Sequence, residues 1–444
     1  MGSASEKLCS FLEQANPFDH SYTELEPLWI EAFNERLAER REQIPVLAKL
    51  CDATGVTEIA ELDEIIPLLF AHSNYKSYPT TLVTKGKWAG MNKWLDTVSA
   101  ERVRDLDVDG VNDQDEWIER LHANGYMVMA TSGTSGKNSF LPGTRGDIEF
   151  SMRAIVPSLQ WNFGIKPAQD RPVFVLGPKY GPTRAPLYNR TMAEAYGRAD
   201  ARFFLTEEPL RISDITRMAA LRKAIADGTA MPSDIAAQEQ QAAQRAAQMD
   251  ERLAELIDLI LDFREEPQII SGFWPQLWTM LETARRRGVP AGSFHPETVL
   301  VAGGGTKGAA LPDDFQEQVL AFFGFGPERV LGGYGMSELS AAMPRQDGRC
   351  RTAPWVIPLI LDRDGPRLLN RTDGLTEGRF AFFDVALEGR WGGLISGDHV
   401  TADLGGASPA VLDGTIRRYT DLEGGDDKLT CAGTIDAFVR GSMG

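Results

Sequence analysis

The chain has few cysteines and few histidines for its length. Among 444 residues there are five histidines, and none stands in a pattern typical of a catalytic triad. The four cysteines, Cys9, Cys51, Cys350 and Cys431, contain no C-x-x-C pair. Four cysteines in a chain of this length do not indicate a disulfide framework. We therefore expect reduced thiols and a cytoplasmic protein.

Positive charge and long hydrophobic runs are also scarce. Lys and Arg number 46 against 63 Asp and Glu, which gives a net charge of −17. Because such a chain repels phosphate backbones and anionic lipids, we expect no nucleic acid and no membrane surface as partner. No apolar run reaches the roughly 18 residues of a membrane-spanning helix. The first residues lack the basic and apolar regions of a signal peptide.

The hydrophobic pattern predicts an α/β protein. Helical spacing recurs over residues 1–70, 86–122 and 233–263, and the Ala/Gln-rich first half of the last helix is expected to be exposed. Apolar runs at 126–130, 172–177 and 298–302 predict strands, and the last two are typical of strands buried on both faces. After about residue 375 the pattern changes to short strands. Together these features indicate a large α/β body with a β-rich end.

A glycine-rich loop directly follows the first predicted strand. Its sequence is Thr131-Ser132-Gly133-Thr134-Ser135-Gly136-Lys137. Glycines let a loop wrap closely around an anion, and successive backbone N–H groups can bind phosphate. The hydroxyl groups and the lysine add further donors. The spacing differs from that of the P-loop NTPases, and a flexible surface loop is the alternative interpretation.

Two further glycine-containing segments follow the loop in the chain. They are Gly303-Gly304-Gly305-Thr306-Lys307 and Tyr334-Gly335-Met336-Ser337-Glu338. Consecutive glycines allow a flat ligand to lie against the backbone. An aromatic ring beside glycines can stack on a base, and a serine and a carboxylate can meet phosphate oxygens and a hard cation such as Mg²⁺.

In this order the three segments resemble the motifs of the adenylate-forming superfamily, which includes acyl-CoA ligases and adenylation domains. TSGTSGK resembles the phosphate loop of the superfamily, and YGMSE resembles its Tyr-Gly-x-Thr/Ser-Glu motif. GGGTK is similar to a segment of the acyl-protein synthetases (LuxE-like), and Gly425-Asp426-Asp427-Lys428-Leu429 resembles the Asp-Asp hinge of the ligases. The resemblance is therefore greatest to the phenylacetate-CoA ligase and acyl-protein synthetase branch.

The resemblance implies the fold and the domain boundaries. We expect a large N-terminal body of sheets packed with helices and a β-rich end. Residues 1–120 would form its helical N-terminal part, and residues 121–420 the nucleotide- and acid-binding body, with a helical insert at about 200–265. Residues 421–444 would be the hinge and a short C-terminal remnant, because the usual C-terminal lid is reduced or missing.

The resemblance also implies roles for single residues. Thr131, Ser132, Thr134 and Lys137 would hold the phosphates of ATP, within the loop Thr131–Lys137. Gly303–Gly305 and Tyr334 would frame the adenine. Ser337 would contact the α-phosphate, and Glu338 with Thr134 would bind Mg²⁺.

A ribose-binding aspartate is also implied, and two residues are candidates. Thr401-Ala402-Asp403-Leu404 precedes the Asp413-Gly414 turn by the expected interval, which favours Asp403. Ser396-Gly397-Asp398 resembles the common Thr-Gly-Asp segment, so Asp398 is the alternative.

The activity implied is ATP-dependent activation of a small carboxylic acid as its acyl-adenylate, with release of pyrophosphate. The acyl group would then pass to a thiol or an amine: coenzyme A, the phosphopantetheine of a carrier protein, an acceptor protein or the chain's own Cys431. Cys431 could equally be a structural residue. Lys428 or Lys307 could replace the lysine of the usual lid. A protein that binds the nucleotide or acyl group without full catalysis is the alternative function.

Overall fold

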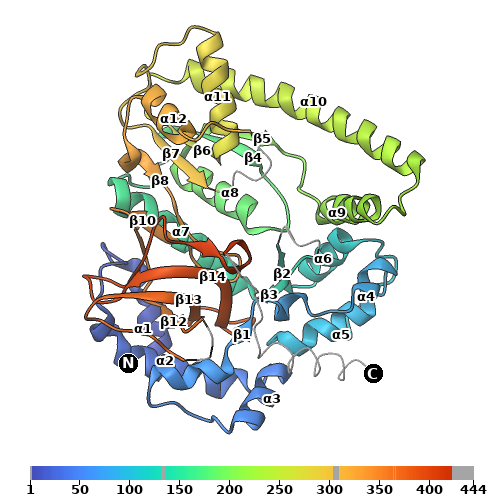
Figure 1. Ribbon diagram of the computed structural model, residues 1–444, viewed down its shortest axis with the longest axis vertical. Coiled ribbons are helices and arrows are strands. Elements are labelled where there is room, and N and C mark those ends of the chain that lie inside the picture. The colour runs from blue at the N-terminus through green and yellow to red at the C-terminus, as the bar shows by residue number, and fades with distance from the viewer. Residues whose placement is uncertain (1–2, 132–136, 304–309, 364, 366, 423–444) are drawn as a thin grey trace. The chain divides into compact units, whose positions relative to one another are not determined.

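The structure is a computed structural model that describes residues 3–131, 137–303, 310–363, 365 and 367–422. The chain forms two compact units (Figure 1). The first unit contains Met1–Pro157 and Tyr334–Gly444, and the second is Ser158–Gly333. The boundaries near residues 120 and 421 remain predictions.

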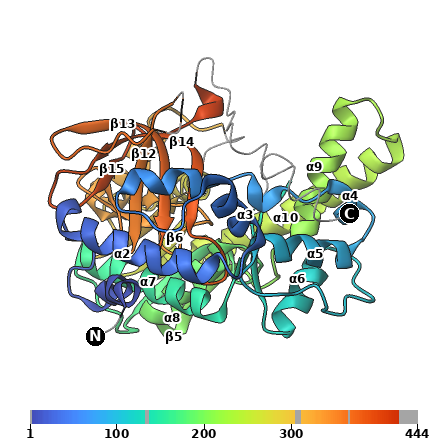
Figure 2. The same ribbon diagram turned by 90° about the horizontal axis from the view of Figure 1, so that it is seen from below.

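The first unit contains a large mixed sheet. Among the described residues it joins, in order, β12 (Val356–Leu361), β13 (Leu375–Asp384), β14 (Gly393–Asp403), β15 (Ala410–Leu412), β11 (Arg349–Arg351), β10 (Met343–Gln346) and β9 (Gly333–Tyr334), and β14 also pairs with β1 (Phe70–Ala71) and β16 (Arg417–Arg418). Strands β12, β13 and β14 lie side by side in antiparallel pairs (Figures 1 and 2). The predicted β-rich end is therefore confirmed, although β13 and β14 are longer than the short strands expected.

The N-terminal region of the first unit is mainly helical, and its helix α2 contacts this sheet. They are α1 (Ala4–Ser10), α2 (Tyr22–Arg40), α3 (Pro45–Thr54), α4 (Thr80–Thr84), α5 (Trp88–Val98) and α6 (Gln114–Ala123). Ser21 caps α2 by accepting the backbone N–H of Glu24. The ring of Phe33 in α2 meets Phe383 of β13 edge-on at 4.7 Å. The helical pattern predicted for residues 1–70 and 86–122 is thus present, broken by the turns between these helices.

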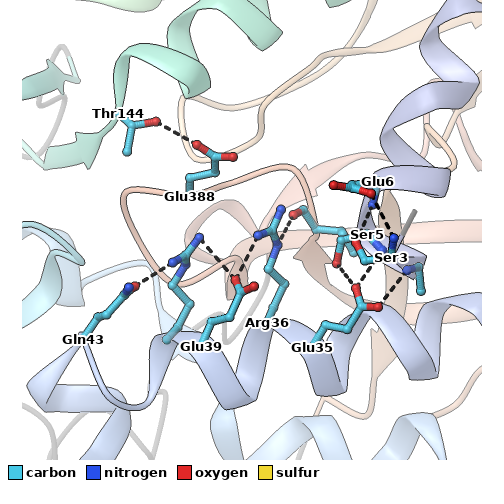
Figure 3. Close-up of polar contacts among 12 residues, drawn as sticks. Ser3, Ser5, Glu6, Glu35, Arg36, Glu39, Gln43, Thr144 and Glu388 are labelled. Atoms are coloured by element: carbon cyan, nitrogen blue, oxygen red, sulfur yellow. Dashed lines mark hydrogen bonds and ion pairs between the residues drawn. The ribbon is translucent and has the colours of Figure 1, made fainter. Parts of the chain in front are cut away.

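Helix α1 is attached to α2 through one carboxylate. Glu35 accepts the backbone N–H of Ala4 at 2.7 Å and that of Ser5 at 2.9 Å (Figure 3). A negative charge at a helix N-terminus also interacts favourably with the helix dipole. Arg36, the next residue, donates to the carbonyl of Val385 at 2.9 Å. The two neighbouring side chains of α2 therefore link α1, α2 and the end of β13.

The second unit is built around a parallel sheet. Its strand order is β5 (Gly197–Thr206), β4 (Arg171–Pro178), β6 (Ile269–Phe273), β7 (Val299–Gly303) and β8 (Val330–Leu331). Helices α8 (Arg184–Tyr196), α9 (Ile212–Ala226), α10 (Pro232–Asp262), α11 (Trp274–Arg286) and α12 (Phe315–Phe323) belong to this unit, and α7 (Arg145–Phe163) leads into it. Phe174 of β4 and Leu300 of β7 are fully buried. The prediction of buried strands at 172–177 and 298–302 is confirmed.

Helix α10 agrees closely with the predicted helix at 233–263. In its C-terminal half Ile257 and Ile260 are buried in the core. In its N-terminal half the described side chains are mostly exposed, as expected for the Ala/Gln-rich segment. Arg245 of this half forms an ion pair with Asp214 of α9 at 3.1 Å. In the described residues, no helix is long and apolar enough to span a membrane.

Candidate functional site

A short hairpin brings the two ends of the glycine-rich loop together. Strands β2 (Met127–Ala130) and β3 (Phe140–Gly143) pair antiparallel. Their ladder continues into the loop, because Thr131 and Ser139 exchange hydrogen bonds, N–H to carbonyl and N–H to hydroxyl, each at 3.0 Å. Ser132, Gly133, Thr134, Ser135 and Gly136 lie outside the described residues. The hairpin therefore determines where the loop begins and where it returns at Lys137.

The first unit contains a cavity of about 260 Å³ at this hairpin. Seven of the residues singled out from the sequence line it: Thr131, Lys137, Gly335, Met336, Ser337, Glu338 and Asp398. Sequence reasoning gave no site role to the other lining residues, which are His72, Lys76, Ser139, Ser396, Gly397 and Arg418. The volume is close to the lower end of typical ligand sites. The cavity thus joins parts of the glycine loop and of the YGMSE motif, which are far apart in the sequence.

Two buried charged residues hold the segment that carries Ser337 and Glu338. Asp384, at the end of β13, accepts the backbone N–H of Ser340 at 2.6 Å and its hydroxyl at 3.1 Å. Arg390 donates to the carbonyls of Pro142 and Glu338, each at 3.0 Å. Both side chains are almost completely buried, and burial raises the pKa of Asp384 to about 6. The YGMSE segment is therefore connected to β13 and to the β2–β3 hairpin.

Glu338 is a carboxyl group surrounded by cations. Burial raises the pKa of Glu338, while the charges of Arg390, Arg418 and Lys76 act to lower it. A carboxyl group in such surroundings can bind a cation or meet a charged ligand. Among the described residues, no group of three or more metal-ligating side chains is present.

Tyr334, Asp398 and Arg418 form a chain of polar contacts. The phenol of Tyr334 donates to Asp398 at 2.7 Å, and the Arg418 guanidinium lies 3.1 Å from the other carboxylate oxygen. Burial raises the pKa of Tyr334 well above its usual value, so the phenol remains a donor at neutral pH. The Tyr334 ring meets Phe380 edge-on at 5.3 Å. Tyr334 is thus a buried support for Asp398 and is not among the described residues that line the cavity.

Asp403, the other aspartate considered for the ribose, lies at the end of the same strand. Its carboxylate is bonded to Arg349, which lowers the pKa of Asp403. Asp403 is not among the described residues that line the cavity, whereas Asp398 is. The structure therefore places only one of the two candidates on the cavity that Glu338 lines.

Lys137 lines the cavity, and its ammonium group is bound by Tyr78, which is not among the lining residues. The ammonium donates to the carbonyl of Tyr78 and lies 4.3 Å from the centre of the Tyr78 ring. Tyr78 in turn donates its hydroxyl to the carbonyl of Asn138 at 2.9 Å. Lys137 therefore contributes a positive charge that is fixed at the wall by Tyr78.

The remaining predicted residues divide between the two units. Gly303 ends β7 in the second unit. Gly304, Gly305, Thr306, Lys307, Lys428 and Cys431 lie outside the described residues. Burial raises the pKa of the thiols of Cys9 and Cys350 to about 12, so neither is an effective nucleophile at neutral pH.

Solved structures of an acyl-CoA ligase have a similar fold. An open conformation of 2-hydroxyisobutyryl-CoA ligase, in complex with 2-HIB-AMP and CoA, is 12% identical, with a TM-score of 0.54. The match covers 92% of this chain and 78% of that chain. The same ligase in the postadenylation state, in complex with R3-HIB-AMP, is also 12% identical, with a TM-score of 0.55 and coverage of 92% and 70%. The chain therefore has the α/β fold of an acyl-CoA ligase. No family model and no curated protein sequence matches it.

Proposed function

We propose that this protein is an adenylate-forming ligase, which activates a small carboxylic acid with ATP and transfers the acyl group to a thiol or an amine. The cavity of the first unit carries the proposal. There, both ends of the glycine loop meet Ser337, Glu338 and Asp398, in a chain that shares its fold with an acyl-CoA ligase. Neither the motif order nor the fold alone would place these groups on one cavity.

The first step needs cations and hydrogen-bond donors but no general base. An oxygen of the substrate carboxylate attacks the α-phosphorus of ATP and forms the acyl-adenylate. The bond from the α-phosphorus to the bridging oxygen of the β-phosphate breaks, and pyrophosphate leaves with the electron pair. No proton moves, because the carboxylate is already ionised. Positive charge placed at the phosphoryl oxygens lowers the barrier of such a reaction.

Several lining residues have a role in this proposal. Thr131, Ser337 and Lys137 contact phosphate oxygens. Asp398 accepts hydrogen bonds from the ribose hydroxyls, and its position in the cavity favours it over Asp403. Tyr334 and Arg418 hold the Asp398 carboxylate from either side. The adenine would lie near Gly303–Gly305, as the resemblance implies.

The residues of the cavity fit a magnesium ion that is bound with the nucleotide. Mg²⁺ in proteins is held by one or two carboxylates together with substrate phosphates and water. Glu338 supplies one carboxylate at the cavity wall, and Thr134 could add a hydroxyl. When bound, the ion would neutralise part of the phosphate charge. Glu338 would orient it.

The acyl acceptor is coenzyme A, a carrier-protein phosphopantetheine, an acceptor protein, Cys431 or an amine. The solved ligase that shares the fold is described in complex with CoA, which supports a thiol acceptor. Burial raises the pKa of the Cys9, Cys51 and Cys350 thiols, which argues against each of them as an acyl carrier. Cys431 therefore remains the internal candidate.

ATP–pyrophosphate exchange with a panel of carboxylic acids tests the proposal. We expect exchange with at least one acid, and its loss in Glu338→Ala. Thermal shifts with ATP and Mg²⁺ should show nucleotide binding in the same preparations. If ATP binds but no acid supports exchange, the protein is a binding partner without catalysis and the proposal is wrong. Intact mass before and after thiol capture, compared with Cys431→Ser, identifies an acyl-Cys431.

A further inference from the structure

The segment that follows β1 contributes two residues, His72 and Lys76, to the cavity wall. β1 pairs in parallel with β14, with Ala71 opposite Ile395. His72 continues this pairing, because its backbone N–H donates to the carbonyl of Ile395 at 3.1 Å. The chain therefore enters the cavity directly beside Ser396 and Asp398, and Lys76 is also one of its lining residues.

The residues around Lys76 are firmly anchored. Tyr75 is buried, and its hydroxyl donates to the carbonyl of Trp391 at 3.0 Å. Ser77 accepts the indole N–H of Trp94 at 3.0 Å. Tyr78 is bonded to Asn138, which follows the glycine loop. The backbone of Lys76 is thus held by contacts that do not involve its own side chain, so truncating this side chain should leave the fold intact.

Lys76 differs in its contacts from the other cations of the cavity. Arg418 is paired with Asp398, and Lys137 is bonded to Tyr78. Within the part of the chain that the structure describes, the Lys76 side chain has no hydrogen bond or ion pair. Lys76 lines the same cavity as Ser337 and Glu338. The Lys76 side chain therefore shares a cavity with the YGMSE motif, and among the described residues its three donor positions are open to a ligand.

We propose that Lys76 is a catalytic residue that contacts the phosphates of ATP during adenylation. This inference rests on the proposed function. As the bond from the α-phosphorus to the β-phosphate breaks, negative charge grows on the phosphoryl oxygens and on the leaving pyrophosphate. The Lys76 ammonium stabilises this charge without giving up a proton. A compact charge on a flexible stem can follow the departing group.

Three variants at this position separate charge from shape. Lys76→Met keeps most of the length and removes the charge, Lys76→Ala removes both, and Lys76→Arg keeps the charge. Lys93→Met is the matched control, because Lys93 is an exposed lysine of α5. We expect Lys76→Met to lower the maximal rate of ATP–pyrophosphate exchange by about 100-fold. The KM for ATP should change less, Lys76→Arg should recover part of the rate, and Lys93→Met should stay within about twofold of the parent.

The two other candidate lysines are tested in parallel. If Lys428→Met or Lys307→Met abolishes exchange while Lys76→Met stays within about threefold of the parent, the charge comes from elsewhere and the proposal is wrong. Circular dichroism and urea unfolding show whether each variant is folded.

A binding readout keeps this inference separate from the proposed function. Calorimetric titration with inorganic pyrophosphate and Mg²⁺ requires no acid substrate. We expect Lys76→Met to weaken pyrophosphate binding about tenfold or more, the effect of losing one charged hydrogen bond, and Lys93→Met to leave it unchanged. Equal binding by the parent and Lys76→Met overturns the inference, whether or not any acid supports exchange. If no acid supports exchange but Lys76→Met binds pyrophosphate about tenfold more weakly than the parent, the phosphate contact is supported. Only the proposed adenylation reaction is then contradicted.

Discussion

Replacing the two candidate ribose aspartates one at a time tests the proposed nucleotide site. Asp398→Asn keeps the size of the side chain and one acceptor oxygen but removes the charge. Asp403→Asn makes the same change on the same strand. The two variants therefore differ mainly in the place where one negative charge is lost.

The contacts of Asp398 give the size of the expected effect. The bond from Tyr334 at 2.7 Å is a hydrogen bond to a charged acceptor, a kind that contributes about 1.5–3 kcal/mol. Arg418 is 61% exposed, so its ion pair adds about 1 kcal/mol or less. Since asparagine can still accept the Tyr334 hydroxyl, we expect Asp398→Asn to lose about 1–2 kcal/mol of unfolding free energy.

The effect on ATP should be larger than the effect on stability. Loss of a charged hydrogen bond to the ribose would raise the KM for ATP by about 10- to 150-fold. For Asp403→Asn, a change of less than about threefold is expected, because Asp403 does not line the described cavity and is paired with Arg349.

ATP dependence of pyrophosphate exchange gives the KM of each variant, and urea unfolding gives its stability. A variant that is folded but has lost exchange can be compared by calorimetric titration with ATP. If Asp403→Asn weakens ATP binding more than Asp398→Asn, the assignment of the ribose to Asp398 is wrong. The spacing of Asp403 to the Asp413-Gly414 turn would then be the better guide.

Two further predictions concern buried groups. The pKa of Asp384 is raised from 3.8 to about 6, so its stabilising contribution is complete below about pH 4 and is lost as the pH rises through about 6, by about 3 kcal/mol in all. Urea unfolding of the parent between pH 4 and 7 should show this loss, whereas Asp384→Asn should not; equal pH slopes would contradict the effect of burial. Because the Cys350 thiol is buried and has a pKa of about 12, iodoacetamide at pH 7.5 should label it in urea but not in the native protein, as measured by peptide mass spectrometry. Native labelling at the rate seen in urea would show that the thiol is accessible.

Much of the fold could be predicted from the sequence because local patterns decide it. Helix α10 has a periodic apolar stripe and a polar first half, and both features appear at the expected residues. Strands β4 and β7 are continuous apolar runs, as strands buried in a parallel sheet require. The glycine loop and the YGMSE segment were also identified, because glycine, hydroxyl and carboxylate groups in these patterns have few other uses.

The composition of the cavity could not be predicted in the same way. Lys76 has no motif around it, and it reaches the cavity because β1 pairs with a strand from the far end of the chain. Arg390 is almost completely buried. Its burial could not be predicted from the sequence, because most arginines are exposed. Both placements depend on contacts between segments that are distant in the sequence.

The sequence by itself determined which groups are available to this protein: a glycine-rich loop with hydroxyl groups and a lysine, a segment with a serine and a carboxylate, and a net charge of −17. Only the tertiary structure decided which aspartate lines the same cavity as Glu338. Asp398 and Asp403 share β14 but are an odd number of residues apart, and side chains alternate between the two faces of a strand. A regular strand therefore directs them to opposite faces, and the pairing of β14 with its neighbours determines which face meets the cavity.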